Sequence, residues 1–257
     1  MAKLLQTRSL HRGLEILDEL ARGPASLQKL HEDTGLPKST LRRLLATLVE
    51  RRYIRRGISD GIYRTNVAIP NSTHGETTFR FGKLVEVARP HMMRLTEVVK
   101  WPSDLHVYHS GRMQILESTH GLSPFESAKG GHADSELNMF VAASGLAYLS
   151  TLEISELAEI FDYAQRDYRW SPARFSMTMA TLTQELAHVR ERGFASRRLS
   201  QIKQDHRSAI AVPILQAHRP IGAITLIWRR DYMSVDEFGK TYAKNLTDTS
   251  FQIEIAL

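Results

Sequence analysis

The chain has 257 residues, of which 42% are hydrophobic and 24% charged, with no cysteine and a net charge of +6. This length allows two domains, and the composition is that of a folded protein. The lack of cysteine excludes disulfides, thiolate metal ligands and cysteine nucleophiles. No run approaches the roughly 18 apolar residues of a membrane span, and the first residues lack the long apolar segment of a secretory signal. We therefore expect a cytoplasmic protein with no membrane partner.

The excess of positive over negative charge is confined to the first quarter of the chain. Residues 1–66 hold 13 Lys and Arg against seven Asp and Glu, whereas residues 67–257 hold 21 against 21. A localised basic excess produces the field that attracts a polyanion. A solvated charged face would give the same counts, so charge alone leaves both interpretations open.

Three short helices are predicted in this basic region. Leucines at helical spacing predict a first helix that is ended by a Gly-Pro pair. Ser26 is a suitable N-cap for the second helix, and Gly35 ends it. Pro37 favours the first position of a third helix that continues to about Glu50.

The third predicted helix has two chemically different faces. Apolar residues at i, i+3, i+4, i+7 and i+8 form a stripe towards a small core, and no acid occurs from Pro37 to Val49. Arginine pairs with guanine edges, hydroxyls bind phosphates or bases, and a helix N-terminus attracts phosphate. We therefore predict that the polar face contacts DNA. The predicted DNA-binding residues of the helices are Ser26, Pro37, Lys38, Ser39, Thr40, Arg42, Arg43 and Thr47.

A β-hairpin is predicted directly after these helices. Two strand-like runs flank Ser59-Asp60-Gly61, and Asp-Gly between such runs is a strong hairpin signal. Two short helices joined at a glycine turn and followed by a hairpin form a winged helix-turn-helix. We expect Arg55, Arg56 and Arg64 to project from the hairpin and bind the DNA backbone or minor groove.

The rest of the chain predicts an α+β domain. A polar stretch at 70–75 is a linker or a helix start, and helical patterns follow it up to Trp101 and recur later in the chain. Four strands are predicted, over residues 104–109, 113–118, 208–215 and 221–228. We expect helices layered on an antiparallel sheet.

Signatures of enzymes are weak. His106 and His109 form an H-x-x-H string, but odd spacing on a strand sends the two imidazoles to opposite faces. Gly130-Gly131-His132 has too few glycines for a phosphate loop, and Ser118 with His120 lacks a third group. We predict no catalytic residue, no metal and no cofactor. A small-molecule-binding enzyme and a nonspecific nucleic-acid-binding protein remain as alternatives.

The motifs also carry a family resemblance. In order and spacing, Ser9–Leu17, Leu36–Leu48 and the pairs Tyr53-Ile54 and Tyr63-Arg64 resemble the winged helix-turn-helix of IclR-type transcriptional regulators. Later segments resemble the same family, namely Ala88–His91, Ala209–Ile214 and Gly222–Ile224. The resemblance implies three parts: a DNA-binding domain at 1–70, a linker helix at 71–90, and a GAF-like effector-binding and oligomerisation domain at 91–257. The implied partners are double-stranded operator DNA, a small-molecule effector, further copies of the chain in a homodimer or homotetramer, and RNA polymerase.

The resemblance also places an effector cleft in the second domain. Its predicted contacts are Ser118, His132, Asn138, Phe140, Arg207, Ser208 and Thr225. Arg207 in particular suits an organic acid. Trp101–Asp104 and Ser123–Phe125 resemble family members that govern catabolism of aromatic acids, whereas the acidic loop Ser135–Asn138 departs from the family pattern and leaves the ligand class open.

Overall fold

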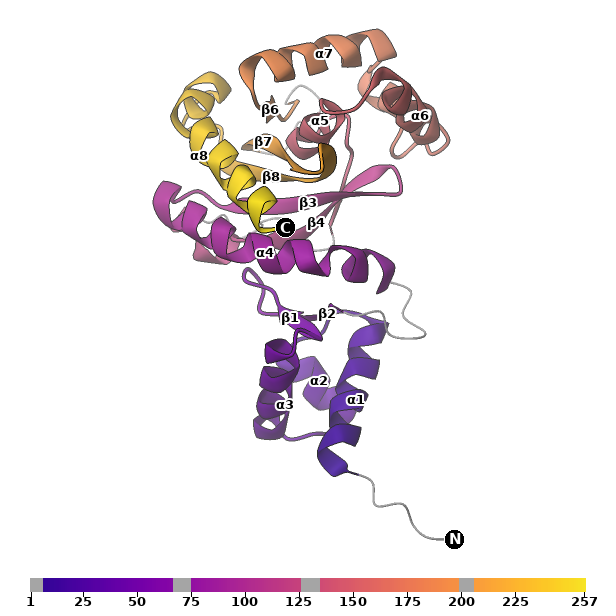
Figure 1. Ribbon diagram of the computed structural model, residues 1–257, viewed down its shortest axis with the longest axis vertical. Coiled ribbons are helices and arrows are strands. Elements are labelled where there is room, and N and C mark those ends of the chain that lie inside the picture. Colours follow the sequence, from indigo (N-terminus) through magenta and orange to yellow (C-terminus); the bar gives the residue numbers. More distant parts are fainter. Residues whose placement is uncertain (1–6, 67–74, 126–134, 199–205) are drawn as a thin grey trace. The chain divides into compact units, whose positions relative to one another are not determined.

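The computed structural model describes residues 7–66, 75–125, 135–198 and 206–257, with side chains of the helix that begins at Gly75 described from residue 81. The chain forms two compact units, Met1–Lys83 and Leu84–Leu257 (Figure 1). None of the described helices is long and apolar enough to cross a membrane.

The N-terminal unit holds three helices and a hairpin: α1 (Arg8–Arg22), α2 (Leu27–Thr34), α3 (Lys38–Glu50), β1 (Ile54–Arg56) and β2 (Tyr63–Thr65). The predicted cap of α2 is confirmed, because the Ser26 hydroxyl accepts a hydrogen bond from the Lys29 N–H at 3.1 Å. Gly35 ends α2 in the left-handed conformation, with φ of 67°. These local signals set the sharp turn into α3.

Packing of α3 follows the predicted apolar stripe. Leu41 and Leu45 are buried in a core that also contains Ile16, Leu20 and Leu30. The neighbouring leucines of the stripe are half-buried, whereas the last member, the valine before Glu50, is 36% exposed. The stripe therefore fixes which face of α3 is turned to solvent.

The hairpin corrects one sequence-based expectation. Arg55 and Arg64 do not project from it, because they are only 2% and 5% exposed. The Arg55 guanidinium donates to the Asn66 side chain at 3.1 Å, and Arg64 donates to the Asp60 carboxylate at 2.8 Å. Arg56 is exposed, as expected, and its guanidinium lies 5.8 Å from the centre of the Tyr63 ring. Hydrogen-bonding partners inside the fold turn two of the three cations inward.

The C-terminal unit is built around an antiparallel sheet of six strands in the order β5-β4-β3-β8-β7-β6. Its strands are β3 (Ser103–His109), β4 (Arg112–Ser118), β5 (Glu136–Leu137), β6 (Ala195–Ser196), β7 (Arg207–Gln216) and β8 (Arg219–Arg229). The four longer strands match the predicted ones, and the fold is α+β with an antiparallel sheet. The two-residue strands β5 and β6 have too short a pattern to be read from sequence.

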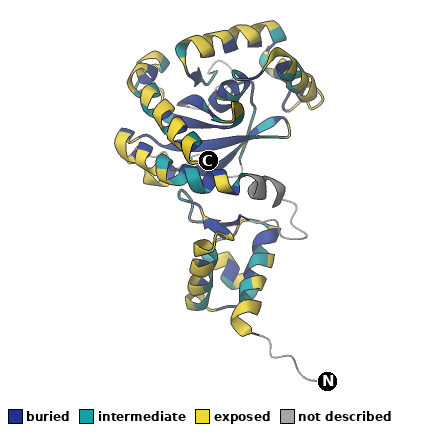
Figure 2. Cartoon of the chain, in the orientation of Figure 1, coloured by how far each residue is buried: buried dark blue, intermediate teal, exposed yellow. Residues whose placement is uncertain are grey.

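Helices cover both faces of this sheet (Figures 1 and 2). They are α4 (Gly75–Val99), α5 (Ala143–Leu149), α6 (Ile154–Gln165), α7 (Met179–Arg192) and α8 (Val235–Ala256), with short 3₁₀ turns η1 (His120–Leu122) and η2 (Pro172–Phe175). On one face, α5 and α7 share a buried core with Met113 and Ala223. On the other face, the ring of Phe238 from α8 stacks on Trp228 of β8 at 3.7 Å between centroids.

Two local features differ from the predicted helices. A single helix, α4, runs through Pro90, where the sequence predicts a connecting helix followed by another. Pro90 is exposed, so the helix tolerates the missing N–H there. The helix predicted from about residue 138 starts only at Ala143, because the chain before it forms turns in which the N–H groups of residues 141 and 142 donate to the Asn138 carbonyl. The backbone of Met139 passes close to Gly145. A Cβ on Gly145 would lie 2.1 Å from the Met139 carbonyl oxygen, so this approach requires glycine.

Candidate functional sites: a polar helix face and a sheet pocket

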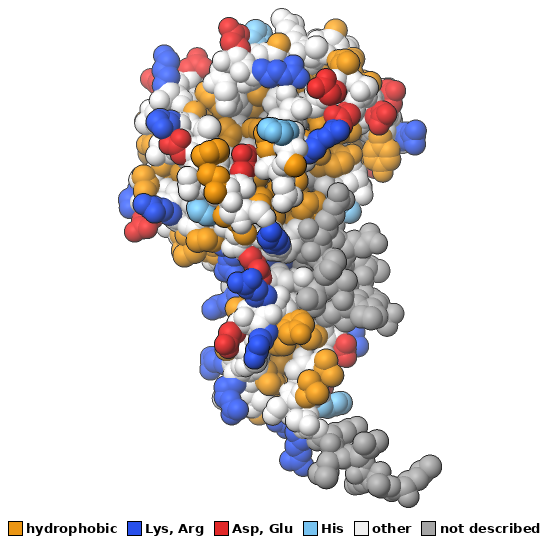
Figure 3. All heavy atoms as spheres, viewed as in Figure 1, with side chains coloured by type: hydrophobic (Ala, Val, Ile, Leu, Met, Phe, Trp, Pro, Cys, Tyr) orange, Lys and Arg blue, Asp and Glu red, His pale blue; other side chains and the backbone are white. Residues whose placement is uncertain are grey.

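The first candidate site is the solvent face of α3. Its exposed polar residues are Lys38, Ser39, Arg42, Arg43 and Thr47, with Pro37 exposed at the start and Thr40 half-buried. Lys and Arg side chains gather over the N-terminal unit (Figure 3). The Thr47 hydroxyl donates to the Arg43 carbonyl at 3.2 Å, which keeps it close to the helix surface. Ser26 is exposed, but its hydroxyl oxygen accepts the cap hydrogen bond of α2.

The second candidate site is a pocket of about 400 Å³ in the C-terminal unit. Its floor is the face of β3, β8 and β7 that carries Asp104, Thr225 and Arg207, and its roof is the segment that leads into α5. This volume lies in the range of about 300–1,000 Å³ that is common for small-molecule sites. Apolar side chains form much of its wall, namely Ile115, Leu137, Val141, Phe175 and Ile227.

Four of the predicted effector contacts line this pocket: Asn138, Arg207, Ser208 and Thr225. Their roles differ. Asn138 uses its side chain inside the roof, donating to the Trp170 carbonyl at 2.8 Å and accepting from the Phe140 N–H at 3.0 Å. Ser208 pairs across the strands with Trp228, whose ring lies under α8, so strand alternation directs its hydroxyl away from the pocket floor.

The other three predicted contacts do not line the pocket in the described structure. The prediction that Phe140 lines the pocket is wrong, because the roof turns its ring into the hydrophobic core, where it is fully buried. Its ring packs edge-on against Phe161, with 5.7 Å between the ring centroids. Ser118 is buried in β4 beside the pocket, and its hydroxyl hydrogen-bonds the Asp104 carboxylate. His132 lies outside the described residues.

Several pocket residues are not among the predicted contacts: Asp104, His106, Glu136, Ser144, Arg174 and Arg197. Asp104 and His106 are two residues apart on β3, so both face the pocket, whereas His109 does not line it. Polar residues that alternate with apolar ones along this strand could have identified Asp104 and His106 as pocket residues from the sequence. Arg174 and Arg197 come from η2 and the stretch after β6, which no local pattern connects with β3.

Charge in the pocket is dominated by arginine. Arg174, Arg197 and Arg207 line it, against the acids Asp104 and Glu136. The Glu136 carboxylate forms an ion pair with Arg112, outside the lining, at 2.8 Å. The pocket therefore favours an anionic ligand.

The titratable groups on β3 are strongly affected by burial. Burial raises the pKa of Asp104, although His106, the Ser118 hydroxyl and Arg207 all act in the opposite direction. Burial lowers the pKa of His106 to about 4, against the effect of Asp104. His106 is therefore neutral near pH 7.

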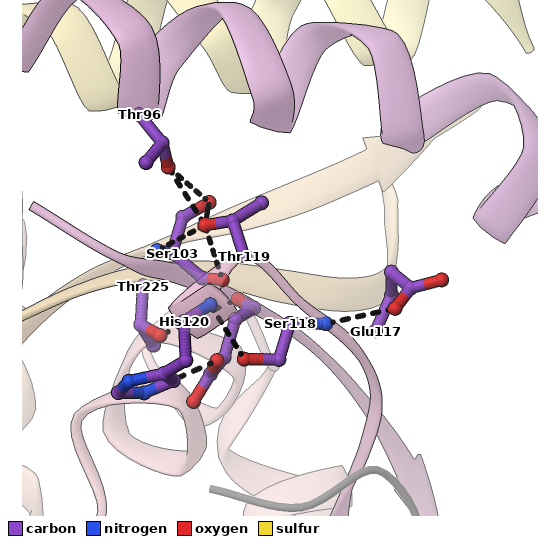
Figure 4. A network of polar contacts seen from close by, with 8 residues as sticks. Thr96, Ser103, Glu117, Ser118, Thr119, His120 and Thr225 are labelled. Atoms are coloured by element: carbon purple, nitrogen blue, oxygen red, sulfur yellow. Dashed lines mark hydrogen bonds and ion pairs between the residues drawn. The ribbon is translucent and has the colours of Figure 1, made fainter. Parts of the chain in front are cut away.

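Behind the pocket, a cluster of hydroxyls joins β3 to α4 (Figure 4). The hydroxyls of Thr96 and Thr119 are 2.7 Å apart, and the Thr119 hydroxyl lies 3.0 Å from that of Ser103. Ser103 precedes Asp104 in β3, so the two side chains lie on opposite faces of the sheet. The pocket strand is thus bonded directly to the last turns of α4.

Among the described residues, no group of three His, Asp or Glu side chains is arranged to hold a metal ion. A winged helix-turn-helix followed by an α+β domain with a polar pocket defines a class of DNA-binding regulators. The comparisons with known proteins agree with this class. The IclR helix-turn-helix domain matches residues 9–57, and the bacterial transcriptional regulator IclR C-terminal domain matches residues 79–255. The chain therefore belongs to the IclR family of bacterial transcriptional regulators.

Individual relatives are distant. The chain is 26% identical to the DNA-binding transcriptional repressor YiaJ of Escherichia coli, over 82% of this chain and 74% of that protein. The crystal structure of Thermotoga maritima IclR has a TM-score of 0.56 at 16% identity, covering 97% of this chain and 98% of that one. An IclR homolog from Microbacterium hydrocarbonoxydans, crystallised with 4-hydroxybenzoate, has a TM-score of 0.54 at 21% identity, covering 97% and 98%. At these identities the solved structures establish the shared fold.

Proposed function

We propose that the chain is a ligand-responsive regulator in which α3 reads operator DNA and the sheet pocket binds a small organic acid. The observation that carries the proposal is the pocket with three arginines in its lining, Arg174, Arg197 and Arg207, in a protein of a DNA-binding family. An aromatic acid and a catabolic operon are the narrower form of this proposal. The complex of a structural neighbour with 4-hydroxybenzoate supports that form.

Operator reading is assigned to the acid-free face of α3, with Arg43 at its centre and the exposed Arg56 of the hairpin as a backbone contact. Operators with two half-sites call for two such faces, so the proposal includes a homodimer or homotetramer. It divides the chain into residues 1–70 for DNA, 71–90 as a linker helix, and 91–257 for effector and assembly. The regulator would work in the cytoplasm, where bacterial operator DNA lies, with RNA polymerase as a further partner.

The DNA part is tested by fluorescence anisotropy with a duplex from the promoter of the chain's own gene and a scrambled duplex, across a salt series. Arg43→Ala is expected to lose the preference for the promoter duplex, at a cost of about 1–3 kcal/mol. Arg166→Ala removes an arginine that is also exposed, from the C-terminal unit, and serves as the matched control. Equal affinity of the native protein for both duplexes would contradict operator reading.

The acid part is tested by calorimetric titration of the full-length protein with benzoate and hexanoate. At least one of these acids is expected to bind, and Arg207→Gln is expected to weaken it by about 10-fold or more, because a charge-assisted hydrogen bond is lost. Lys240→Gln, an exposed change on α8, is the control. Unchanged affinity in Arg207→Gln would contradict the role of Arg207.

A further inference from the structure

Two buried side chains on the pocket floor have hydrogen-bonding atoms that the described fold does not use. Asp104 and His106 are each 2% exposed. Asp104 Oδ1 and both ring nitrogens of His106 have no hydrogen-bond partner among the described residues. Leaving buried polar atoms unpaired costs about 1–3 kcal/mol for each group. Both residues line the pocket, and unpaired polar groups in the lining of a pocket are typical of ligand-binding positions.

We propose that Asp104 and His106 together bind a hydroxyl group of the effector, so that the pocket selects hydroxylated carboxylic acids. The inference rests on the proposed function, in which the same pocket binds an organic acid. It adds the chemical class of that acid and the two residues that recognise it.

The hydrogen-bonding capacities of the pair favour a hydroxyl. The carboxylate of Asp104 only accepts, whereas a neutral imidazole offers one N–H donor and one acceptor nitrogen. A hydroxyl can donate to Asp104 and accept from His106 at the same time. Thr225, which is the cross-strand partner of Asp104, does not compete, because its own hydroxyl donates to the Asp104 backbone carbonyl at 3.3 Å.

The charges around the pair disfavour the main alternative, an ammonium group. An ammonium only donates, so it could not use the donor of His106. It would also enter a pocket lined by Arg174, Arg197 and Arg207, in which Glu136 is already paired with Arg112. A neutral group that pairs with Asp104 avoids this repulsion.

The sheet register puts the proposed hydroxyl site and Arg207 at different ends of the pocket. Asp104 pairs with Thr225, and Thr225 pairs with Ala211. Ala211 is four residues from Arg207 on β7, which corresponds to about 13 Å along the strand at roughly 3.3 Å per residue. The long Arg207 side chain shortens this span. A small acid therefore has room for its carboxylate near Arg207 and its hydroxyl near Asp104.

The test compares isosteric pairs of acids that differ only in a hydroxyl or a methyl group, by calorimetric titration of the full-length protein. The pairs are 4-hydroxybenzoate with 4-methylbenzoate, and 5-hydroxypentanoate with hexanoate. We expect a preference for the hydroxylated member of at least one pair by about 10-fold or more. Asp104→Leu, which replaces the carboxylate by an apolar group of similar size, is expected to abolish or reverse that preference.

Two further variants make the result specific. Glu117→Gln neutralises another buried carboxylate, which faces Arg89 at 3.6 Å and does not line the pocket, and it is expected to leave the ratio of affinities unchanged. Asp104→Asn keeps the shape and an acceptor oxygen, and is expected to lower the ratio by about threefold or more. It serves as the test if Asp104→Leu does not fold.

The outcomes separate this inference from the proposed function. Equal binding of both members of each pair would overturn the hydroxyl inference and leave acid binding intact. Tighter binding of 4-(aminomethyl)benzoate than of 4-hydroxybenzoate would also overturn it, in favour of an ammonium site. Failure of all these acids to bind would overturn both proposals. A loss of preference in Glu117→Gln equal to that in Asp104→Leu would show that Asp104 has no specific role.

Discussion

Asp104 Oδ1 and His120 Nε2 lie 3.8 Å apart, and both side chains are buried. This distance is too long for a hydrogen bond, so His120 does not satisfy that oxygen. Burial raises the pKa of Asp104, which means that the folded protein disfavours the charged carboxylate. The contribution of Asp104 to stability is therefore greatest at low pH and declines as the pH rises through the folded-state pKa.

Asp104→Asn is accordingly expected to stabilise the C-terminal unit at pH 7, by about 1–3 kcal/mol, because it removes a buried charge and retains an acceptor for Ser118. Urea unfolding at pH 7 measures the gain, which should shrink towards pH 4. Asp248→Asn, in an exposed pair with Lys244, is the control and should change stability by less than about 0.5 kcal/mol. A loss of stability at pH 7 in Asp104→Asn would contradict the interpretation.

His106 predicts a pH dependence of the opposite sign. Its folded-state pKa of about 4 lies below the ordinary value of 6.5, so the unfolded chain binds more protons between these values. The stabilising contribution of neutral His106 is complete above about pH 6.5 and is lost as the pH falls towards 4, by up to about 3 kcal/mol. Asp104, whose pKa is raised, opposes this trend, and Arg207 and Ser144 line the same pocket as His106.

His106→Gln should therefore flatten the fall in stability between pH 6.5 and pH 4. Denaturant unfolding at half-unit steps of pH measures the slope. His188→Gln serves as a control, because the His188 side chain is 62% exposed. An identical slope in the native protein and His106→Gln would show that the ring does not carry this dependence.

The elements of the N-terminal unit could be predicted because local signals determine them. Ser26 forms the cap bond and Gly35 adopts the left-handed conformation. Helix α3 begins one residue later than predicted, because Pro37 is its N-cap rather than its first helical residue. The inward turn of Arg55 and Arg64 could not be predicted, because it depends on Asn66 and Asp60 reaching these cations in three dimensions. The local sequence around an arginine in a hairpin does not distinguish an exposed side chain from one that is buried against a hydrogen-bonding partner.

The pocket was predictable only in part for a related reason. Arg207 and Thr225 lie on strands whose apolar pattern is clear, and both line the pocket. Arg174 and Arg197 reach it from segments far away in the sequence, and Phe140 points into the core because the roof is an irregular turn before α5. Side-chain direction in such turns depends on tertiary packing rather than on a period of two or 3.6.

Thr96→Val tests the hydroxyl cluster that bonds α4 to β3. Valine keeps the shape of threonine but removes the 2.7 Å contact with Thr119, which retains its bonds to Ser103. We expect a loss of stability of about 1–2 kcal/mol in urea unfolding. Thr241→Val on α8 is the control, because its exposed hydroxyl donates to the Glu237 carbonyl within its own helix. Equal effects of the two variants would mean that the cluster adds nothing beyond an ordinary helix bond.

The ion pair between Asp60 and Arg64 is expected to hold the hairpin in shape. Burial acts to raise the pKa of Asp60, but hydrogen bonds from Arg64 and from the Ile62 N–H outweigh it, and the pKa is lowered. A carboxylate with a lowered pKa stabilises the fold above its unfolded pKa near 3.8, and this contribution is lost as the pH falls through the folded value.

Asp60→Asn should therefore speed hydrogen exchange of the amides in β1 and β2 at neutral pH, corresponding to a local loss of about 1–2 kcal/mol, since the two hydrogen bonds from Arg64 lose their charged acceptor. Mass spectrometry of the full-length protein measures the exchange. Asp33→Asn is the matched control, because Asp33 forms an exposed i, i+4 pair with Lys29 at 2.7 Å, for which little effect is expected. Unchanged exchange in the hairpin of Asp60→Asn would mean that the strand hydrogen bonds and the packing of Ile54 suffice, and that the buried Arg64 does not depend on its carboxylate partner.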